Sequence, residues 1–170
     1  MKKLYFARHG QTKLNLAGKI SGRTETDLTD EGRVQAKLAG QKAKKLQIDL
    51  IVCSPMSRAV ETAQIIAKEV GIDPKKVVQQ KLVIERDFGE LEGKPYAPDI
   101  NLDGISDLEA IDDLIHRAKL ALNWLQARPE DNILVVSHGS FGRALRSLIR
   151  EEYHFNHPSR LMNADIHHWL

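Results

Sequence analysis

The stretch FARHGQT, residues 6–12, ends a short apolar run with an arginine, a histidine and a glycine. Residues 3–7, KLYFA, lack the alternation of polar and apolar side chains typical of a half-exposed strand, so we expect a strand covered on both faces. Such a strand delivers Arg8 and His9 to one edge of a sheet. The pair is compatible with a solvated strand end or with the centre of a reactive site.

Two further runs predict buried strands, LIVCS at 50–54 and NILVVS at 132–137, and VVQQKLVI at 77–84 is a weaker candidate. Helical patterns lie between them. A helix over about 30–46 follows the N-cap candidate Thr29, with Val34, Leu38 and Ala39 on one face. A second helix is expected from the Ser54–Pro55 pair to about residue 70. Others are expected over 108–127 and about 140–152, the former with a clear amphipathic face (Ile111, Leu114, Ile115, Ala118, Leu122 and Leu125).

Alternating strands and helices predict an α/β protein, a three-layer α/β/α sandwich with a mainly parallel central sheet. The 170 residues favour a single domain, 1–170, interrupted only by a loop-like insertion at about 94–107. This insertion could be a lid or rim over a site, or a plain surface connection.

Composition narrows the function classes. Apolar residues make up 42% and charged residues 28%, and the net charge of +2 gives no case for a nucleic-acid or membrane partner. The single cysteine, Cys53, lies in an apolar run, where a buried thiol is expected, and it excludes an intramolecular disulfide or a zinc site built from several cysteines. The start of the chain lacks a signal-peptide pattern, so a cytoplasmic protein is expected. The oligomeric state is not predicted.

Polar side chains follow the three best strands. The first strand ends in Arg8-His9-Gly10, the second at Ser54 with Arg58 one turn further on, and the last in Ser137-His138-Gly139. Because the carboxyl ends of parallel strands meet at one edge, two arginines, two histidines and two helix N-termini are expected together. That combination predicts an anion pocket, and arginine's planar fork favours phosphate.

A phosphate pocket that contains histidine indicates phosphoryl transfer, with one histidine as nucleophile and the other cations stabilising charge on the phosphoryl oxygens. The leaving alkoxide needs a proton donor. Glu85, which follows the weak fourth strand, is the candidate, and Glu90 and Glu92 are competitors that fit a turn better. No metal-binding carboxylate cluster is evident near these strands, so we expect neither metal nor other cofactor.

Five motifs in order resemble the histidine phosphatase superfamily, the branch that includes the cofactor-dependent phosphoglycerate mutases: FARHGQTKLN, SGRTETDLTDEG, IVCSPMSRAVETA, ERDFGELEG and VVSHGSFGRAL. The terminal LMNADIHHWL is similar to a late strand of that family. The motifs cover most of the chain from residue 3 to about 150.

The resemblance implies a role for each matching residue. His9 would form a phosphohistidine that water hydrolyses, and Glu85 would act first as acid and then as base. The phosphoryl group would be bound by Arg8, Arg58, His138, Asn15 and the Gly139 backbone, with Ser21 and Gly22 on the substrate side. Gln11 stands where the family commonly has glutamate, so its role is left open.

The same resemblance leaves two reactions to separate, hydrolysis and mutase-type transfer. From Pro95 to His116 there are six acids and no lysine or arginine, namely Asp99, Asp103, Asp107, Glu109, Asp112 and Asp113. A mutase needs extra cations for an anionic phosphoglycerate, so hydrolysis of a small phosphorylated metabolite is favoured. Phosphoglycerate mutase activity and a phosphohistidine-protein phosphatase are the alternatives.

Three other functional interpretations fit the sequence less well. HGSFG at 138–142 is similar to a serine-hydrolase elbow but has His138 where that motif requires glycine. A non-catalytic phosphoanion-binding module would not need Glu85. The C-terminal histidines, His154, His157, His167 and His168, lack an accompanying carboxylate pattern and fit solvated or packed positions better than a metal site.

Overall fold

The structure, a computed structural model, describes residues 2–170. Five strands form one sheet in the order β3-β2-β4-β1-β5. β1, β2, β3 and β4 are parallel, and β5 pairs with β1 in the antiparallel sense. The strands are β1 (Lys3–Arg8), β2 (Leu50–Cys53), β3 (Val78–Gln79), β4 (Asn132–Ser137) and β5 (Ile166–His168).

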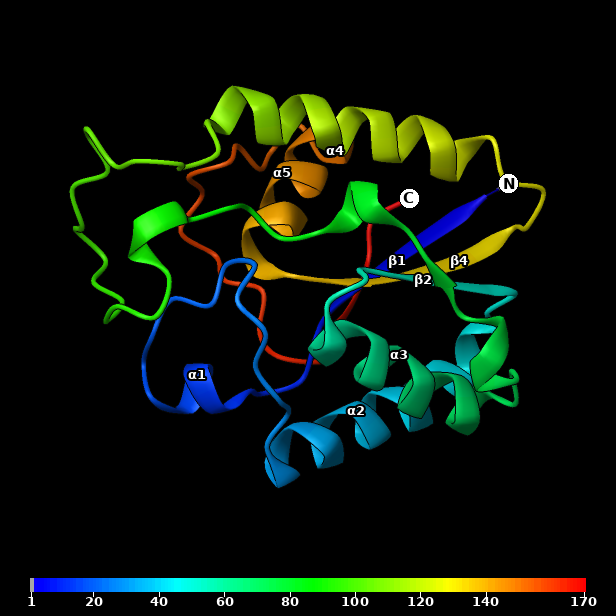
Figure 1. Ribbon diagram of the computed structural model, residues 1–170. Coiled ribbons are helices and arrows are strands. Elements are labelled where there is room, and N and C mark those ends of the chain that lie inside the picture. Colours follow the sequence, from blue (N-terminus) through cyan, green and yellow to red (C-terminus); the bar gives the residue numbers. More distant parts are fainter. Residues whose placement is uncertain (1) are drawn as a thin grey trace.

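Helices cover both faces of the sheet (Figure 1). The helices are α1 (Lys13–Leu16), α2 (Asp30–Ala43), α3 (Ser57–Val70), α4 (Ile111–Gln126) and α5 (Gly139–Ile149). α2 and α3 lie on one side of the strands, and α4 and α5 lie on the other (Figure 1). Short 3₁₀ turns occupy Lys44–Leu46, Pro74–Lys76, Lys81–Val83 and Gly89–Leu91. The predicted three-layer α/β/α architecture with a mainly parallel sheet is therefore confirmed.

The alternation of side chains along β1 divides the core into two halves. Leu4 and Phe6 pack with the apolar face of α4 and α5, whereas Tyr5 and Ala7 pack with α2 and α3. This is the two-residue period of a strand buried on both faces. The predicted apolar face of α4 is confirmed, with Leu114, Ala118 and Leu125 buried in the first of these halves.

Of the three α2 residues predicted to share one face, Ala39 is buried and the two larger ones are exposed. Thr29 is the N-cap, as expected, but Val34 and Leu38 are each 51% exposed. The buried residues are small, namely Gly32, Ala36, Ala39, Gly40 and Ala43. A β-carbon on Gly40 would stand 2.6 Å from Glu69 Cβ on α3, so the close approach of the two helices explains why small residues line the interface.

Two other boundaries differ from the sequence prediction. α3 begins at Ser57 rather than at Pro55, because the Ser54 hydroxyl accepts the N–H of Met56 and so caps the turn before the helix. The predicted strand over 77–84 is reduced to Val78–Gln79, since the chain turns into a 3₁₀ helix at Lys81. Residues 94–107 contain neither helix nor strand. Their first residues are connected to the rest of the chain by an isolated antiparallel β-bridge between Lys19 and Pro95.

Candidate active site

Arg8 and His9 stand at the carboxyl end of β1, where the strand leaves its pairing with β4. Arg8 Nη1 donates to the carbonyl of Leu161 at 3.2 Å. Arg8 Nε is buried and has no acceptor among residues 2–170. The guanidinium is thus held by one nitrogen, and Nε is left for an anion.

His9 is buried, and its two ring nitrogens have different partners. Nδ1 lies 2.7 Å from the carbonyl oxygen of Gly10, which can only accept, so Nδ1 carries the proton. Nε2 accepts from Arg58 Nε at 3.3 Å. The hydrogen bonds therefore fix the tautomer whose lone pair is on Nε2, and Nε2 is the nitrogen able to attack.

Arg58 is the second residue of α3, and its side chain is 1% exposed. Besides His9, its guanidinium binds the carbonyls of Thr24 through Nη1 at 2.9 Å and of Gly22 through Nη2 at 2.5 Å. One arginine thus connects the nucleophile with the loop at 21–24. Gly22 takes φ +50°, which turns its carbonyl toward Arg58 without the strain that a side chain would add.

His138 follows β4, and its ring centroid lies 5.2 Å from that of His9. The Ser54 hydroxyl, at the end of β2, is 2.7 Å from His138 Nε2. The hydroxyl can accept the N–H of Met56 and donate its own proton to Nε2, and in that arrangement the ring proton resides on Nδ1. His138 Nδ1 is buried with no acceptor in the described part of the chain. It is a second donor suited to an anion.

Burial and neighbouring cations keep both histidines neutral. Desolvation, reinforced by the charges of Arg8 and Arg58, holds the pKa of His9 well below 6.5. Desolvation and then Arg58 lower the pKa of His138 in the same way. A neutral imidazole is the nucleophilic form, so the environment that attracts an anion also prepares His9 for attack.

Glu85 reaches the same edge of the sheet. Its Oε1 accepts the N–H groups of Arg86 at 2.8 Å and of Phe141 at 2.9 Å, and its Oε2 accepts, among residues 2–170, only that of Ser140, at 3.2 Å. Oε2 therefore retains a lone pair and is the oxygen available for a proton. The competitors are engaged elsewhere: Glu92 binds Arg23 N and Thr24 Oγ1, and Glu90 binds Ser106 N.

The two helix N-termini reach this edge of the sheet, and carboxylates already accept some of their first-turn amides. Glu85 occupies the first-turn amides of α5, and Glu25 accepts from both Ser57 N and Ser57 Oγ at the start of α3. Carboxylates are favourable partners for these dipole ends. The amide of Gly139, the first residue of α5, is not bound by Glu85 and lies beside Arg8.

The remaining predicted binding residues lie around this centre. Ser21 Oγ is buried without a partner in residues 2–170, next to the Gly22 carbonyl that Arg58 holds. Gly139 opens α5, and a β-carbon there would lie 3.8 Å from Arg8 Nε. Asn15 is partly engaged, since its Oδ1 accepts the N–H of Thr12 and caps α1.

Gln11, whose role was left open, has a structural partner. Its Oε1 accepts the hydroxyl of Thr29 at 2.9 Å, and its carbonyl accepts the N–H of Thr29. The side chain thus binds the N-cap of α2.

Two residues near the nucleophile were missed by the sequence analysis. Thr62 Oγ1 accepts the N–H of Gly10 at 3.0 Å, and Asn163 Nδ2 donates to the carbonyl of His9 at 2.9 Å. Thr62 lies in the stretch IVCSPMSRAVETA and Asn163 in LMNADIHHWL, but neither residue directly follows a strand, so no role was assigned to them. Thr62 is a polar residue on the apolar face of a helix, and this pattern is the one that could have indicated a buried hydrogen-bonding role.

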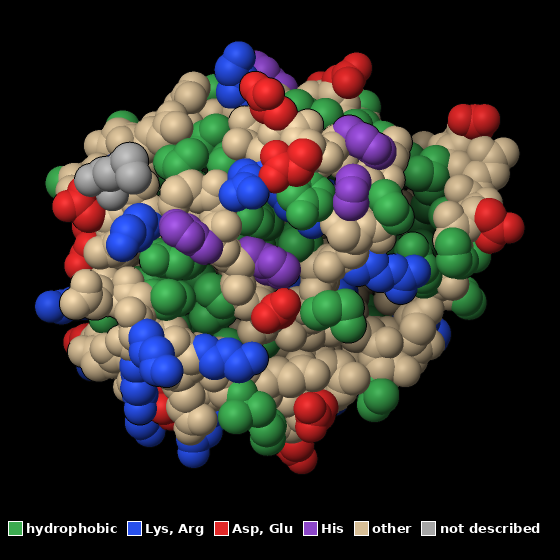
Figure 2. Space-filling view, turned by 180° about the vertical axis from the view of Figure 1, so that it is seen from behind, with side chains coloured by type: hydrophobic (Ala, Val, Ile, Leu, Met, Phe, Trp, Pro, Cys, Tyr) green, Lys and Arg blue, Asp and Glu red, His purple; other side chains and the backbone are tan. Residues whose placement is uncertain are grey.

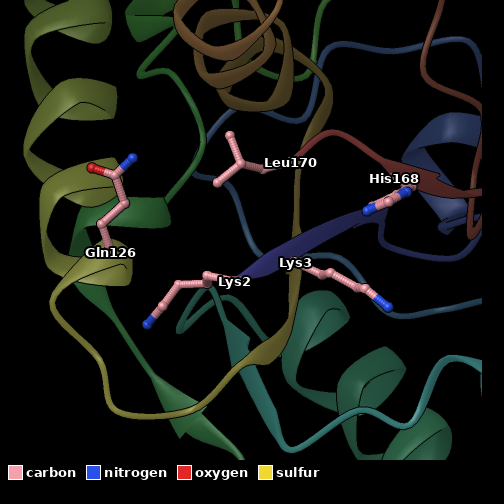
Figure 3. A pocket seen from close by; sticks show the side chains of 5 residues that line it. All are labelled: Lys2, Lys3, Gln126, His168 and Leu170. Atoms are coloured by element: carbon pink, nitrogen blue, oxygen red, sulfur yellow. The ribbon is translucent and has the colours of Figure 1, made fainter.

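Other surface features lack this combination. Figure 3 shows a cavity of about 320 Å³ at the amino end of β1, at the far end of the strand from His9, lined by Lys2, Lys3, Gln126, His168 and Leu170. Histidines also gather on the side turned away in Figure 1 (Figure 2). Throughout residues 2–170, no group of three or more His, Cys, Asp or Glu side chains is arranged to hold a metal ion. Within the same range no helix has the length and apolar character needed to cross a bilayer.

Comparison with known proteins identifies relatives along almost the whole chain. The uncharacterized phosphatase PhoE of Bacillus subtilis is 32% identical over 170 residues, covering 96% of this chain and 86% of its own length. A 2,3-bisphosphoglycerate-dependent phosphoglycerate mutase of Mesorhizobium japonicum is 40% identical over 92 residues, 53% of this chain and 45% of that protein.

A solved structure with a similar fold is a phosphoserine phosphatase variant from Entamoeba histolytica in complex with phosphoserine. It superposes with a TM-score of 0.79 at 33% identity, over 98% of this chain and 89% of that one. The profile described as Histidine phosphatase superfamily (branch 1) matches residues 4–168. The fold, the relatives and this match agree, and the chain belongs to the histidine phosphatase superfamily.

Proposed function

We propose that the protein hydrolyses a small phosphomonoester through a phosphohistidine on His9, with no metal ion, and that residues 1–170 work as one catalytic domain. The observation that carries the proposal is the position of His9 Nε2, whose lone pair is available because the proton lies on Nδ1. It faces Arg58 Nε at 3.3 Å, beside the unpartnered Arg8 Nε and His138 Nδ1. These groups supply a nucleophile and the charge needed by a phosphoryl group in transfer.

In the first step Nε2 attacks phosphorus, an N–P bond forms and the P–O bond to the leaving group breaks. Protonated Glu85 gives its proton, from Oε2, to the departing alkoxide. In the second step the Glu85 carboxylate takes a proton from water while the water oxygen attacks phosphorus. The N–P bond then breaks, its electron pair returns to Nε2, and inorganic phosphate leaves.

Hydrolysis is favoured over mutase transfer by the segment that follows Lys94. It contains Asp99, Asp103 and Asp107, all exposed, and no arginine or lysine up to residue 107. It therefore supplies no cation for the second anionic group of a phosphoglycerate.

Trapping the phosphoenzyme tests the nucleophile. Base-quenched turnover of a ³²P-labelled phosphomonoester should leave a label on the wild-type protein that is stable in base and lost in acid, and no label on His9→Ala. The matched control is His154→Ala, an exposed histidine, which should label and turn over normally. Unchanged turnover by His9→Ala would overturn the proposal. Formation of 2-phosphoglycerate from 3-phosphoglycerate, faster than phosphate release, would favour the mutase instead.

Leaving-group dependence tests the acid. Glu85→Gln should slow an alkyl phosphate by about a hundredfold or more, because poor leaving groups need a proton, and should slow p-nitrophenyl phosphate far less. Steady-state kcat for the two substrates measures this. Equal loss on both would remove Glu85 as the acid.

A further inference from the structure

We infer that Arg117 and Glu109 form a positioning pair that sets the place of the Glu85 carboxyl group, an inference that rests on the proposed role of Glu85 as the acid. Neither residue belongs to the motifs at the strand ends, and both act through the segment 82–87, which carries Glu85.

The segment needs such a support because no sheet ladder holds it. β3 ends at Gln79, and the following residues turn through a 3₁₀ helix at Lys81–Val83. Catalytic groups lose activity when misplaced by about 1 Å, on the order of a hundredfold in rate. A loop that carries an acid must therefore be fixed by side chains.

Arg117, in the middle of α4, binds consecutive turns of this loop. Its Nη1 donates to the carbonyls of Leu82 at 2.9 Å and Ile84 at 2.7 Å, and its Nη2 donates to that of Glu85 at 3.4 Å. The guanidinium also lies 5.5 Å from the ring centroid of Phe141, whose N–H binds Glu85 Oε1. One side chain thus contacts both the backbone of the acid and the residue that orients its carboxylate.

Glu109 holds Arg117 in this position. Its two oxygens bind Arg117 in a fork, at 3.0 Å to Nε and 2.9 Å to Nη2, and the side chains are only 13% and 15% exposed. Such a bidentate pair restricts the direction of the guanidinium as well as its distance.

Glu109 also contacts the loop beyond the acid. Its Oε2 accepts the N–H of Asp87 at 3.2 Å, and its carbonyl accepts Arg86 Nε at 2.8 Å. Arg23 lies on the other side, 3.5 Å from the same Oε2, and its Nε donates to the Glu85 carbonyl at 3.0 Å. Glu109 therefore connects the segment 82–87, the 21–24 loop and the end of the 94–107 insertion.

The test is a double-mutant cycle with two substrates. Glu109→Gln should lower kcat for an alkyl phosphate by about tenfold and that for p-nitrophenyl phosphate by less than about threefold, because only the first needs a well-placed proton. In the Glu85→Gln background the same substitution should have almost no further effect on the alkyl ester. Arg117→Lys, which keeps the charge and loses the fork, should reproduce the pattern if Glu109→Gln folds poorly.

The matched control is Glu130→Gln. Glu130 forms a similar fork with Arg128, at 3.2 Å to Nε and 3.0 Å to Nη2. Its substitution should leave kcat for both substrates unchanged. Equal losses on the two substrates, or a loss that persists in the Glu85→Gln background, would overturn the inference while leaving the acid in place. A Glu85→Gln variant without leaving-group dependence would instead contradict the proposed function itself.

Discussion

His9 and Arg58 depend on each other more closely than their separation in sequence suggests. Arg58 Nε donates to His9 Nε2, the nitrogen proposed to attack phosphorus, and the same guanidinium donates to the carbonyls of Gly22 and Thr24. When a phosphoryl group binds, Arg58 can shift its donation from Nε2 to a phosphoryl oxygen, which releases the lone pair for attack. Its fork geometry therefore matters as well as its charge.

At this scale we predict that Arg58→Ala lowers kcat/KM for p-nitrophenyl phosphate at least roughly a hundredfold, about 3 kcal/mol of transition-state stabilisation. Arg58→Lys should not restore the rate, since a single ammonium cannot serve His9 and two carbonyls together. Thermal melting of each variant checks that it is folded. A loss smaller than threefold, or recovery with lysine, would contradict this assignment.

The residues that carry the proposed chemistry could be predicted because each directly follows a strand or begins the next helix. Arg8, His9, Arg58 and His138 needed only the rule that parallel strands end at one edge. Thr62 and Asn163 could not be predicted in this way. Their contacts with residues 9 and 10 span 52 and 154 positions of sequence, and one polar side chain gives no pattern.

At the scale of elements, α2 and α3 pack through small residues rather than through large apolar ones. The amphipathic pattern does not identify this interface, because Val34 and Leu38 follow a helical spacing, yet they face away from the sheet. What decides the interface is how closely the backbones approach, and periodicity of large residues does not encode that distance.

Gly40→Ala tests this packing. The new β-carbon would stand 2.6 Å from Glu69 Cβ and 3.2 Å from Ile66 Cα, so α2 must move. Overpacking costs about 1–3 kcal/mol, while alanine gains about 1 kcal/mol of helix propensity over glycine. We expect a net loss of about 1 kcal/mol in the free energy of unfolding, measured by urea denaturation.

Val34→Ala on the same helix is the control for Gly40→Ala. Because Val34 is exposed, its substitution should change stability by less than about 0.5 kcal/mol. A Gly40→Ala protein more stable than wild type would show that the helices do not approach as closely as described.

For the whole molecule, the two neutral buried histidines link stability to pH. The pKa values of His9 and His138 are lowered by burial and then by neighbouring arginines, whereas in the unfolded chain they return to about 6.5. Below that pH the two histidines bind protons in the unfolded state but stay neutral in the folded state. Their contribution to stability is therefore complete above about pH 6.5 and is lost as the pH falls toward the lowered values.

We therefore expect the free energy of unfolding to fall by up to about 1.4 kcal/mol per pH unit for each of the two histidines below pH 6.5. Urea denaturation at pH 7.5, 6.5 and 5.5 in a buffer free of phosphate measures the slope. His9→Ala should have a shallower slope by up to one proton. Equal slopes in the two proteins would mean that His9 titrates alike when folded and unfolded.

The overall architecture was the most predictable level, because strand and helix periods repeat over many residues and tolerate local errors. The order of the strands was less accessible. Nothing in the composition of residues 166–168 requires them to pair antiparallel beside β1, which depends on Trp169 stacking on Phe6 at 4.5 Å and on other distant contacts.

That strand order has a consequence for biosynthesis. β1 is translated before the other strands of this sheet but lies between β4 and β5, which are translated after β2 and β3. The carbonyl of His9 accepts a hydrogen bond from Asn163, and the guanidinium of Arg8 donates one to the carbonyl of Leu161. Neither bond can form until these late residues have been made. Residues up to 163 must therefore leave the ribosome before His9 and Arg8 gain these contacts. A nascent polypeptide that stalls before residue 161 carries Arg8, His9, Arg58, Glu85 and His138 without them.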